Sequence, residues 1–108
     1  METRASGGQE TPFVKVHYTK RAESDLHDIA VYTLIRWGPE QWQKYSSLLQ
    51  VACEEIIPRN LRYAQSVPER PGLCRWQCEQ HVIFFRKVKA GIEIVRILHE
   101  RMLPMGHL

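Results

Sequence analysis

Residues 81–88, HVIFFRKV, constrain the fold of this 108-residue chain more than any other segment. In an extended conformation Val82 and Phe84 point to one face of the strand. Ile83 and Phe85 point to the other face, so the run is apolar on both sides. A strand of this kind lies in the interior of a sheet and not at its edge. We therefore predict a sheet with residues 81–88 in its interior.

Two further extended runs flank this strand, at residues 73–78 and 92–102. The residues that join the three runs, Glu79-Gln80 and Lys89-Ala90-Gly91, are few enough for hairpin turns. The three runs are therefore predicted to form an antiparallel meander. Regular alternation gives the last run two apolar faces, the first made of Ile92, Ile94 and Leu98 and the second of Val95 and Ile97.

Two polar residues, Arg96 and His99, interrupt the otherwise apolar last run. A charged or polar side chain in such a strand requires a partner. We expect Arg96 to pair with a helix carboxylate, either Asp25 or Asp28. His99 is expected to have a structural role, with hydrogen bonds inside the sheet or to the helices.

The first half of the chain reads as one strand followed by two helices. Residues 13–18 alternate as a strand does, and apolar residues then recur at helical spacing through residues 20–37 and 39–58. Thr19 suits the N-cap of the first helix, and Gly38-Pro39 suits the end of that helix and the start of the next.

The resulting order is β-α-α-β-β-β, an α+β fold with a helical hairpin packed on one face of a mainly antiparallel sheet. The first strand is expected at an edge or beside the last strand. Residues 59–72 contain two prolines and several arginines, which predicts a loop. Trp37 and Trp42 fall on the apolar faces of the two helices, so both are predicted to lie in the core.

Length and composition predict one domain, residues 13–103, because a chain of this size buries a single core. Residues 1–12 are polar and lack an apolar stretch, which predicts a disordered extension and not a secretory signal. Residues 104–108 are expected to be a tail. No apolar run approaches the roughly 20 residues of a membrane span. Three cysteines without a signal peptide indicate reduced thiols and a cytoplasmic protein.

The formal charge of +3 is unevenly distributed along the chain. Between residues 59 and 101 the acidic residues are only Glu69, Glu79, Glu93 and Glu100. The basic residues of the same segment are Arg59, Arg62, Arg70, Arg75, Arg86, Lys87, Lys89, Arg96 and Arg101. Such a basic half suits a nucleic-acid surface, an enzyme that acts on nucleic acids, or an acidic protein segment. It equally suits a solvated face that keeps the chain in solution.

The sequence contains no phosphate-binding glycine loop, nucleophile triad, metal-ligand spacing or cofactor motif. The only side chains of the predicted sheet suited to acid–base work or charge stabilisation are His81, Arg75, Arg86, Arg96 and His99. The two histidines begin one strand and end the next. A short antiparallel hairpin brings such positions close together, so a two-histidine arrangement is geometrically possible.

Several blocks of this sequence, in this order and spacing, resemble the ParE toxins of bacterial ParD–ParE toxin–antitoxin pairs, within the RelE/ParE superfamily. The blocks cover most of residues 14–102 and are Ala22-x-x-Asp25-Leu26-x-Asp28-Ile29, Arg36-Trp37-Gly38-x-Glu40-Gln41, Tyr45, Pro71-Gly72-Leu73, His81 to Arg86, and Ile94 to Met102. The family's fold has the same β-α-α-β-β-β order. Family members often carry an acidic residue after the Arg-Met pair, where this chain has Leu103.

The resemblance implies a non-enzymatic toxin that inhibits DNA gyrase and is neutralised by a ParD-like antitoxin in a hetero-oligomer. No cofactor, metal or membrane association is implied. An acidic, amphipathic antitoxin segment that folds on binding would suit the apolar helices and the basic half of the chain. The arginines expected to contact it are Arg59, Arg62, Arg75 and Arg86.

The alternative is a RelE-type enzyme, because relatives of that kind share the fold and cut messenger RNA on the ribosome. In such an enzyme the catalytic set of this chain would be His81, Arg75, Arg96 and His99. The aromatic hydroxyl that some relatives carry near the C-terminus is absent, since the last tyrosine is Tyr63.

Overall fold

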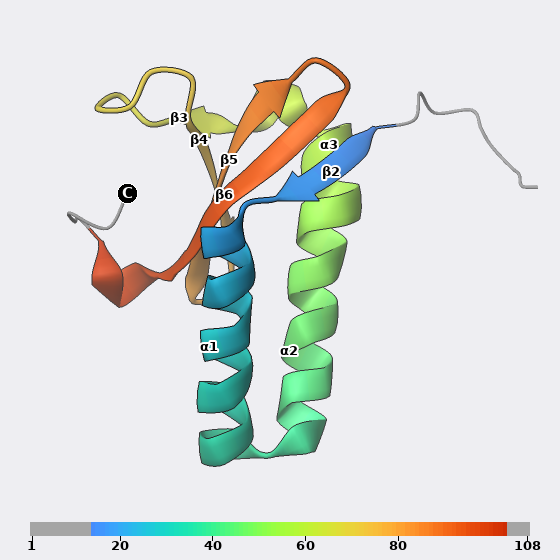
Figure 1. Cartoon of the computed structure of the whole chain (residues 1–108), viewed down its shortest axis with the longest axis vertical. Coiled ribbons are helices and arrows are strands. Elements are labelled where there is room, and N and C mark those ends of the chain that lie inside the picture. Colours follow the sequence, from blue (N-terminus) through green and yellow to red (C-terminus); the bar gives the residue numbers. More distant parts are fainter. Residues whose placement is uncertain (1–13, 104–108) are drawn as a thin grey trace, which may run out of the picture.

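A helical hairpin and a five-stranded sheet form the two layers of the molecule (Figure 1). The computed structural model describes residues 14–103, and the predicted extension, Phe13 and the C-terminal tail lie outside them. The elements in chain order are β2 (Lys15–Tyr18), α1 (Lys20–Trp37), α2 (Pro39–Val51), the π-helical turn η1 (Ala52–Ile56), α3 (Ile57–Arg59), the 3₁₀ turn η2 (Leu61–Tyr63), β3 (Gln65–Ser66), β4 (Cys74–Cys78), β5 (His81–Val88), β6 (Gly91–His99) and the 3₁₀ turn η3 (Glu100–Met102). The α+β class and the packing of the hairpin on the sheet are confirmed.

The strand order across the sheet is β2-β6-β5-β4-β3. Strands β4, β5 and β6 form the predicted antiparallel meander, with β5 in the interior. Strand β2 lies at the edge and pairs with β6 in parallel, which confirms the predicted position beside the last strand. Gly91 is needed at this pairing, because a Cβ there would collide with the Lys15 carbonyl oxygen.

The ends of the first helix are set by the residues that the sequence indicates. The Thr19 hydroxyl accepts a hydrogen bond from the Ala22 amide at 3.0 Å and donates one to the Val95 carbonyl at 2.8 Å. It therefore caps α1 and ties the helix to β6. Gly38 ends α1 with φ of 93°, a value that favours glycine, and Pro39 begins α2.

The predicted second helix is interrupted before its end. Regular α-helix stops at Val51 and is followed by η1 and α3. Pro58 has no N–H to donate to the residue 54 carbonyl, which accounts for the local change of pattern. The predicted loop at residues 59–72 is wrong in part, because it contains η2 and the short strand β3, which pairs with β4.

Two apolar clusters fill the two faces of the sheet. On the hairpin side, Ile83 and Phe85 pack with apolar residues of α1, α2 and β6. On the other side, Val82 and Phe84 pack against Val67 and Leu73, which belong to the segment between β3 and β4. The two-faced burial of β5 predicted from its sequence is therefore confirmed.

Strand β6 departs from regular alternation at a β-bulge. Phe84 pairs with Arg96 while Phe85 pairs with Ile94, so Val95 is an extra residue. As a result Ile97 faces the hairpin with Ile92 and Ile94, and Leu98 faces the other cluster with Val95. The predicted faces of Ile97 and Leu98 are therefore wrong, because a single inserted residue exchanges the two faces of a strand.

The turn end of the helical hairpin extends beyond the sheet (Figure 1). Trp37 lies at this end and is 64% exposed, so the prediction that it belongs to the core is wrong. Its helical spacing is correct, but no strand reaches far enough to cover it. Trp42 packs against the core as predicted. Leu48 and Ile56 also fall at the apolar spacing of the second predicted helix, but both are exposed.

Candidate functional site

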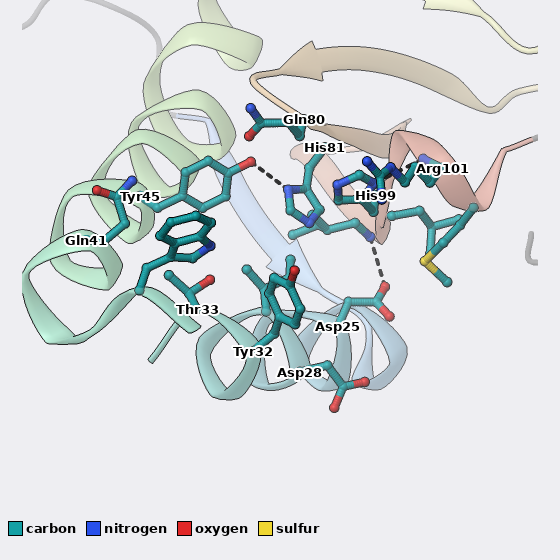
Figure 2. Close-up of a pocket in the computed structure, with 15 residues that line it drawn as sticks. Asp25, Asp28, Tyr32, Thr33, Gln41, Tyr45, Gln80, His81, His99 and Arg101 are labelled. Carbon is teal, nitrogen blue, oxygen red and sulfur yellow. Dashed lines mark hydrogen bonds between the residues drawn. The ribbon is translucent and has the colours of Figure 1, made fainter. Parts of the chain in front are cut away.

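A groove of about 790 Å³ lies between the hairpin and the chain that follows β6 (Figure 2). One wall comes from α1 and α2, and the other from the beginning of β5, the end of β6 and the turn η3. The residues that line the groove include Asp25, Asp28, Tyr32, Trp37, Tyr45, His81, His99, Arg101 and Met102. Aromatic and polar groups therefore meet at one end of the molecule.

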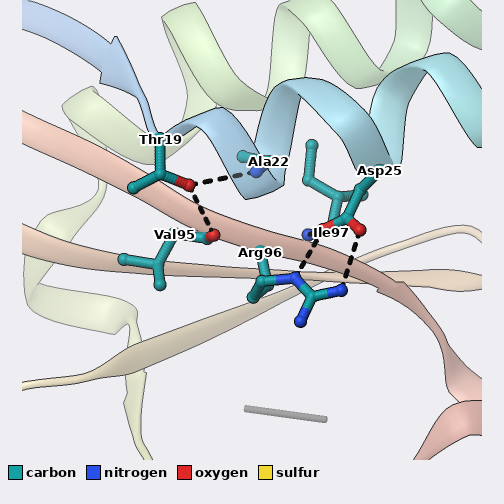
Figure 3. A network of polar contacts seen from close by, with 6 residues as sticks. All are labelled: Thr19, Ala22, Asp25, Val95, Arg96 and Ile97. Atoms are coloured by element: carbon teal, nitrogen blue, oxygen red, sulfur yellow. Dashed lines mark hydrogen bonds and ion pairs between the residues drawn. The ribbon is translucent and has the colours of Figure 1, made fainter.

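An ion pair between Asp25 and Arg96 joins α1 to β6 beside this groove (Figure 3). The Arg96 Nε and Nη2 atoms donate to the two oxygens of Asp25 at 2.8 and 2.9 Å. Asp25 Oδ2 also accepts from the Ile97 amide at 2.9 Å. These bonds raise the pKa of Arg96 above its ordinary value. The pairing of Arg96 with Asp25 was one of the two predicted from sequence, and it fixes the helix against the bulged strand.

A second polar contact, between Tyr45 of α2 and His81 of β5, closes the inner part of the groove. The Tyr45 hydroxyl and His81 Nδ1 are 2.6 Å apart. Burial raises the pKa of Tyr45 to about 12. Burial, followed by the neighbouring His99, lowers the pKa of His81 to about 4. At neutral pH the phenol therefore donates to a neutral imidazole, whose remaining proton is on Nε2.

His99 lies directly across the strand pair from His81. Their ring centroids are 5.2 Å apart and the rings meet edge to face at 79°. His99 Nδ1 accepts from the Arg101 amide at 3.0 Å and so caps the turn η3. The structure thus brings the two histidines together, as their places in the hairpin predicted. The hydrogen bond of His99 is thus made to the turn η3, and not within the sheet or to the helices as predicted.

The other arginines of the predicted catalytic and antitoxin-binding sets lie away from this groove. Arg75 faces the other side of the sheet, with its guanidinium 5.9 Å from the Phe84 ring centroid. Arg86 pairs with Glu93 at 2.7 Å and is largely exposed. Arg59 ends α3 and Arg62 lies in η2, both exposed. The predicted catalytic set is therefore divided, with Arg75 separated by the sheet from the histidines.

Sequence reasoning missed the role of several groove residues. Tyr45 was named only as part of the family resemblance, without its bond to His81. Tyr32 and Met102 were given no role, although they are 61% and 37% exposed at the groove. The one available signal was the concentration of large apolar residues in the last two turns of α1, more than one buried face requires.

No group of three or more His, Cys, Asp or Glu side chains within residues 14–103 is arranged to hold a metal ion. In the same part of the chain no helix is long and apolar enough to span a bilayer. The cysteines Cys53, Cys74 and Cys78 are free thiols, as predicted.

Comparison with known proteins decides the family. The model of the ParE toxin of the type II toxin–antitoxin system parDE matches residues 16–104. Toxin ParE1 of Caulobacter vibrioides is 37% identical over 90 residues, which cover 83% of this chain and 93% of that protein. This chain belongs to the ParE toxin family. Toxin ParE1 of Mycobacterium tuberculosis is 35% identical over 83 residues, covering 75% of this chain and 84% of that protein.

Solved structures support the ParE-type fold. The chromosomal ParDE toxin–antitoxin system from P. aeruginosa matches with a TM-score of 0.67 and 23% identity, over 82% of this chain and 98% of that one. The E. coli DinJ–YafQ toxin–antitoxin complex matches with a TM-score of 0.51 and 12% identity, over 84% of this chain and 97% of that one. At these identities the likeness shows the fold alone. The resemblance read from the sequence blocks is confirmed, and the chain is a ParE-type toxin of a type II toxin–antitoxin system.

Proposed function

We propose that this ParE-type toxin inhibits DNA gyrase in the cytoplasm and is neutralised by a ParD-like antitoxin. Membership of the ParE family supports the proposal, as does the ParDE system among the solved structures of the same fold. The observation that carries the antitoxin part is the groove, whose wall includes exposed Tyr32, Trp37 and Met102. Such a wall suits the apolar face of an amphipathic segment that folds as it binds.

The antitoxin is proposed to contact Arg59, Arg62, Arg75 and Arg86 as well as the groove. Because Arg75 and Phe84 face away from the hairpin, one linear segment reaches both regions only by passing around an edge of the molecule. Acidic side chains would then meet the arginines, while apolar side chains enter the groove. This division predicts two separable contributions, one sensitive to salt and one insensitive.

Titration with the product of the reading frame adjacent to this gene tests the proposal. We expect Trp37→Ala to weaken binding about equally at low and high salt, because it removes apolar contact. The double variant Arg75→Ala/Arg86→Ala is expected to weaken binding at low salt and to reduce its salt dependence. Leu48→Ala, another exposed apolar residue of the hairpin but outside the groove, is the control. Absence of a complex with the wild-type chain would refute the antitoxin proposal.

The geometry supports a non-enzymatic toxin. Cleavage of RNA requires a proton acceptor, a proton donor and charge stabilisation around one phosphate. Here each histidine has its Nδ1 atom already engaged, by Tyr45 and by the Arg101 amide. Arg96 is held by Asp25, and Arg75 lies across the sheet. The members of the predicted catalytic set are therefore occupied with other groups or separated by the sheet.

A messenger-RNA endoribonuclease of RelE type is the second candidate, because His81 and His99 do lie side by side. Induction of wild type and His99→Ala separates the two functions. If the toxin inhibits gyrase, induction of the wild type should reduce DNA supercoiling and leave messenger RNA intact. Rapid message cleavage that His99→Ala abolishes, with supercoiling unchanged, would overturn the gyrase proposal and favour the nuclease.

A further inference from the structure

The outward face of α1 carries an exposed apolar strip with opposite charges at its two ends. We call the five residues Asp28, Val31, Tyr32, Ile35 and Arg36 the α1 strip. Ile35 is 81% exposed, Tyr32 61% and Val31 41%. Of the eleven exposed large apolar side chains within residues 14–103, five lie between positions 31 and 37. Such a concentration marks an interaction surface, since apolar residues on a surface are normally scattered.

The charged ends of the strip have no partner of opposite charge within residues 14–103. Asp28 forms no ion pair there, and Arg36 only lies over the ring of Trp37, 5.8 Å from its centroid. The two residues are eight positions apart on one helix face, a separation of about 12 Å along the axis. Tyr32 lies midway between them. A negative end, an apolar centre and a positive end therefore follow one another.

This order makes the strip complementary to itself. If two copies of α1 cross in antiparallel orientation about a two-fold axis near Tyr32, Asp28 of each copy meets Arg36 of the partner subunit. Two ion pairs then form, and Val31, Tyr32 and Ile35 of both copies are buried between them. A strip with charges of one sign would instead require a partner of the opposite sign. We propose that the α1 strip is a homodimer interface of the free toxin.

The size of the strip limits the strength of this dimer. A standard protein interface uses roughly 20–30 residues a side. The strip offers far fewer, so we expect a reversible dimer with a dissociation constant in the micromolar range. Asp28 and Tyr32 also line the groove beside the strip. An antitoxin in that groove would therefore compete with the second copy, so the dimer is proposed for the toxin without antitoxin. It does not depend on the identity of the toxin's target.

Analytical ultracentrifugation of the purified chain, from low to high micromolar concentration, tests the proposal. The wild type is expected to shift from monomer to dimer over this range. Ile35→Asp should remain monomeric throughout, because dimerisation would bury two carboxylates. Tyr63→Asp is the matched control, since Tyr63 is 67% exposed but lies in η2, outside the strip. It should dimerise as the wild type does.

Charge exchange gives the sharper test. Asp28→Arg and Arg36→Asp should each raise the dissociation constant of the dimer about tenfold, because one substitution removes both symmetry-related ion pairs. The double variant Asp28→Arg/Arg36→Asp restores opposite charges and should restore the dimer. A monomeric wild type at every concentration would overturn the proposal. So would a dimer that Ile35→Asp leaves intact, or single reversals that the double variant does not rescue. If Ile35→Asp weakens only the complex with the antitoxin, the strip belongs to the antitoxin instead.

Discussion

The two halves of α1 differ in what holds them. The half nearest β2 is bound to the sheet by polar contacts, from Thr19 to Val95 and from Asp25 to Arg96 and Ile97. The half nearest the Gly38 turn has no strand beneath it and exposes most of its large apolar side chains, Ile35 among them. One continuous helix is thus fixed to the sheet at one end and leaves an apolar surface exposed at the other, where we propose that partners bind. The difference shows that an exposed apolar residue here reflects the reach of the sheet and not a defect of packing.

Removal of the Asp25 carboxylate should have the largest effect on the first half. Asp25→Ala leaves the Arg96 guanidinium without its carboxylate and the Ile97 amide without its acceptor. We expect the free energy of unfolding to fall by about 3–5 kcal/mol, as for other broken buried pairs. Urea denaturation measures the change. Asp28→Ala, one turn further along the helix and exposed, is the control and should change stability by less than about 0.5 kcal/mol. Equal effects of the two variants would contradict the assignment.

A matched pair of isoleucines compares the two halves directly. Ile29 is 8% exposed and packs in the core cluster, whereas Ile35 is 81% exposed. Ile29→Ala is expected to cost about 2–4 kcal/mol in the free energy of unfolding, through lost burial and a cavity. Ile35→Ala should stay within about 0.5 kcal/mol of wild type. Thermal unfolding of dilute samples, where the toxin is monomeric, measures both. A large loss of stability in Ile35→Ala would show that the second half is also part of the fold.

A smaller effect is expected from pH at His81, where the groove meets the core. The folded chain holds the pKa of His81 at about 4, below its ordinary value of 6.5. Between these two values the unfolded state takes up a proton that the folded state does not, so stability is lost as pH falls from 6.5 toward 4. Because water partly screens a half-buried ring, we expect a loss of about 1–2 kcal/mol. His81→Gln should lack this component when denaturation curves at pH 7 and pH 4.5 are compared. An unchanged pH dependence would locate the titration elsewhere.

Much of the fold was accessible from sequence because local patterns determine it. Each of three local patterns predicts its own structure from a few neighbouring residues, and all three are confirmed. They are the two-faced run of β5, the cap at Thr19 and the Gly38-Pro39 turn. The bulge at Val95 was not accessible, because an inserted residue leaves no mark in a run that is apolar on both faces. The exposure of Trp37 was also missed, since periodicity shows which face of a helix is apolar but not how far the sheet extends beneath it.

The candidate site was accessible only in part. The proximity of the two histidines could be predicted from strand-pairing rules alone. The carboxylate partner of Arg96 could be predicted because an apolar strand rarely leaves a charge unpaired. The contact of Tyr45 with His81 depends on how α2 crosses the sheet, which no local pattern encodes. For the same reason the division of the arginines between two faces became visible only in three dimensions.

The parallel pairing of β2 with β6 has a consequence for the order of events during synthesis. Lys15–Tyr18 find their partners only among residues 91–94, so this edge of the sheet cannot form until most of the chain has left the ribosome. Pairing across such a sequence distance is slow compared with closure of the β5–β6 hairpin. A nascent chain therefore exposes β2 before its partner strand is available, and this edge of the sheet closes only after residues 91–94 have emerged. Protease sensitivity of ribosome-arrested chains, compared with that of the released protein, would show whether this edge of the sheet is still open while the chain is being made.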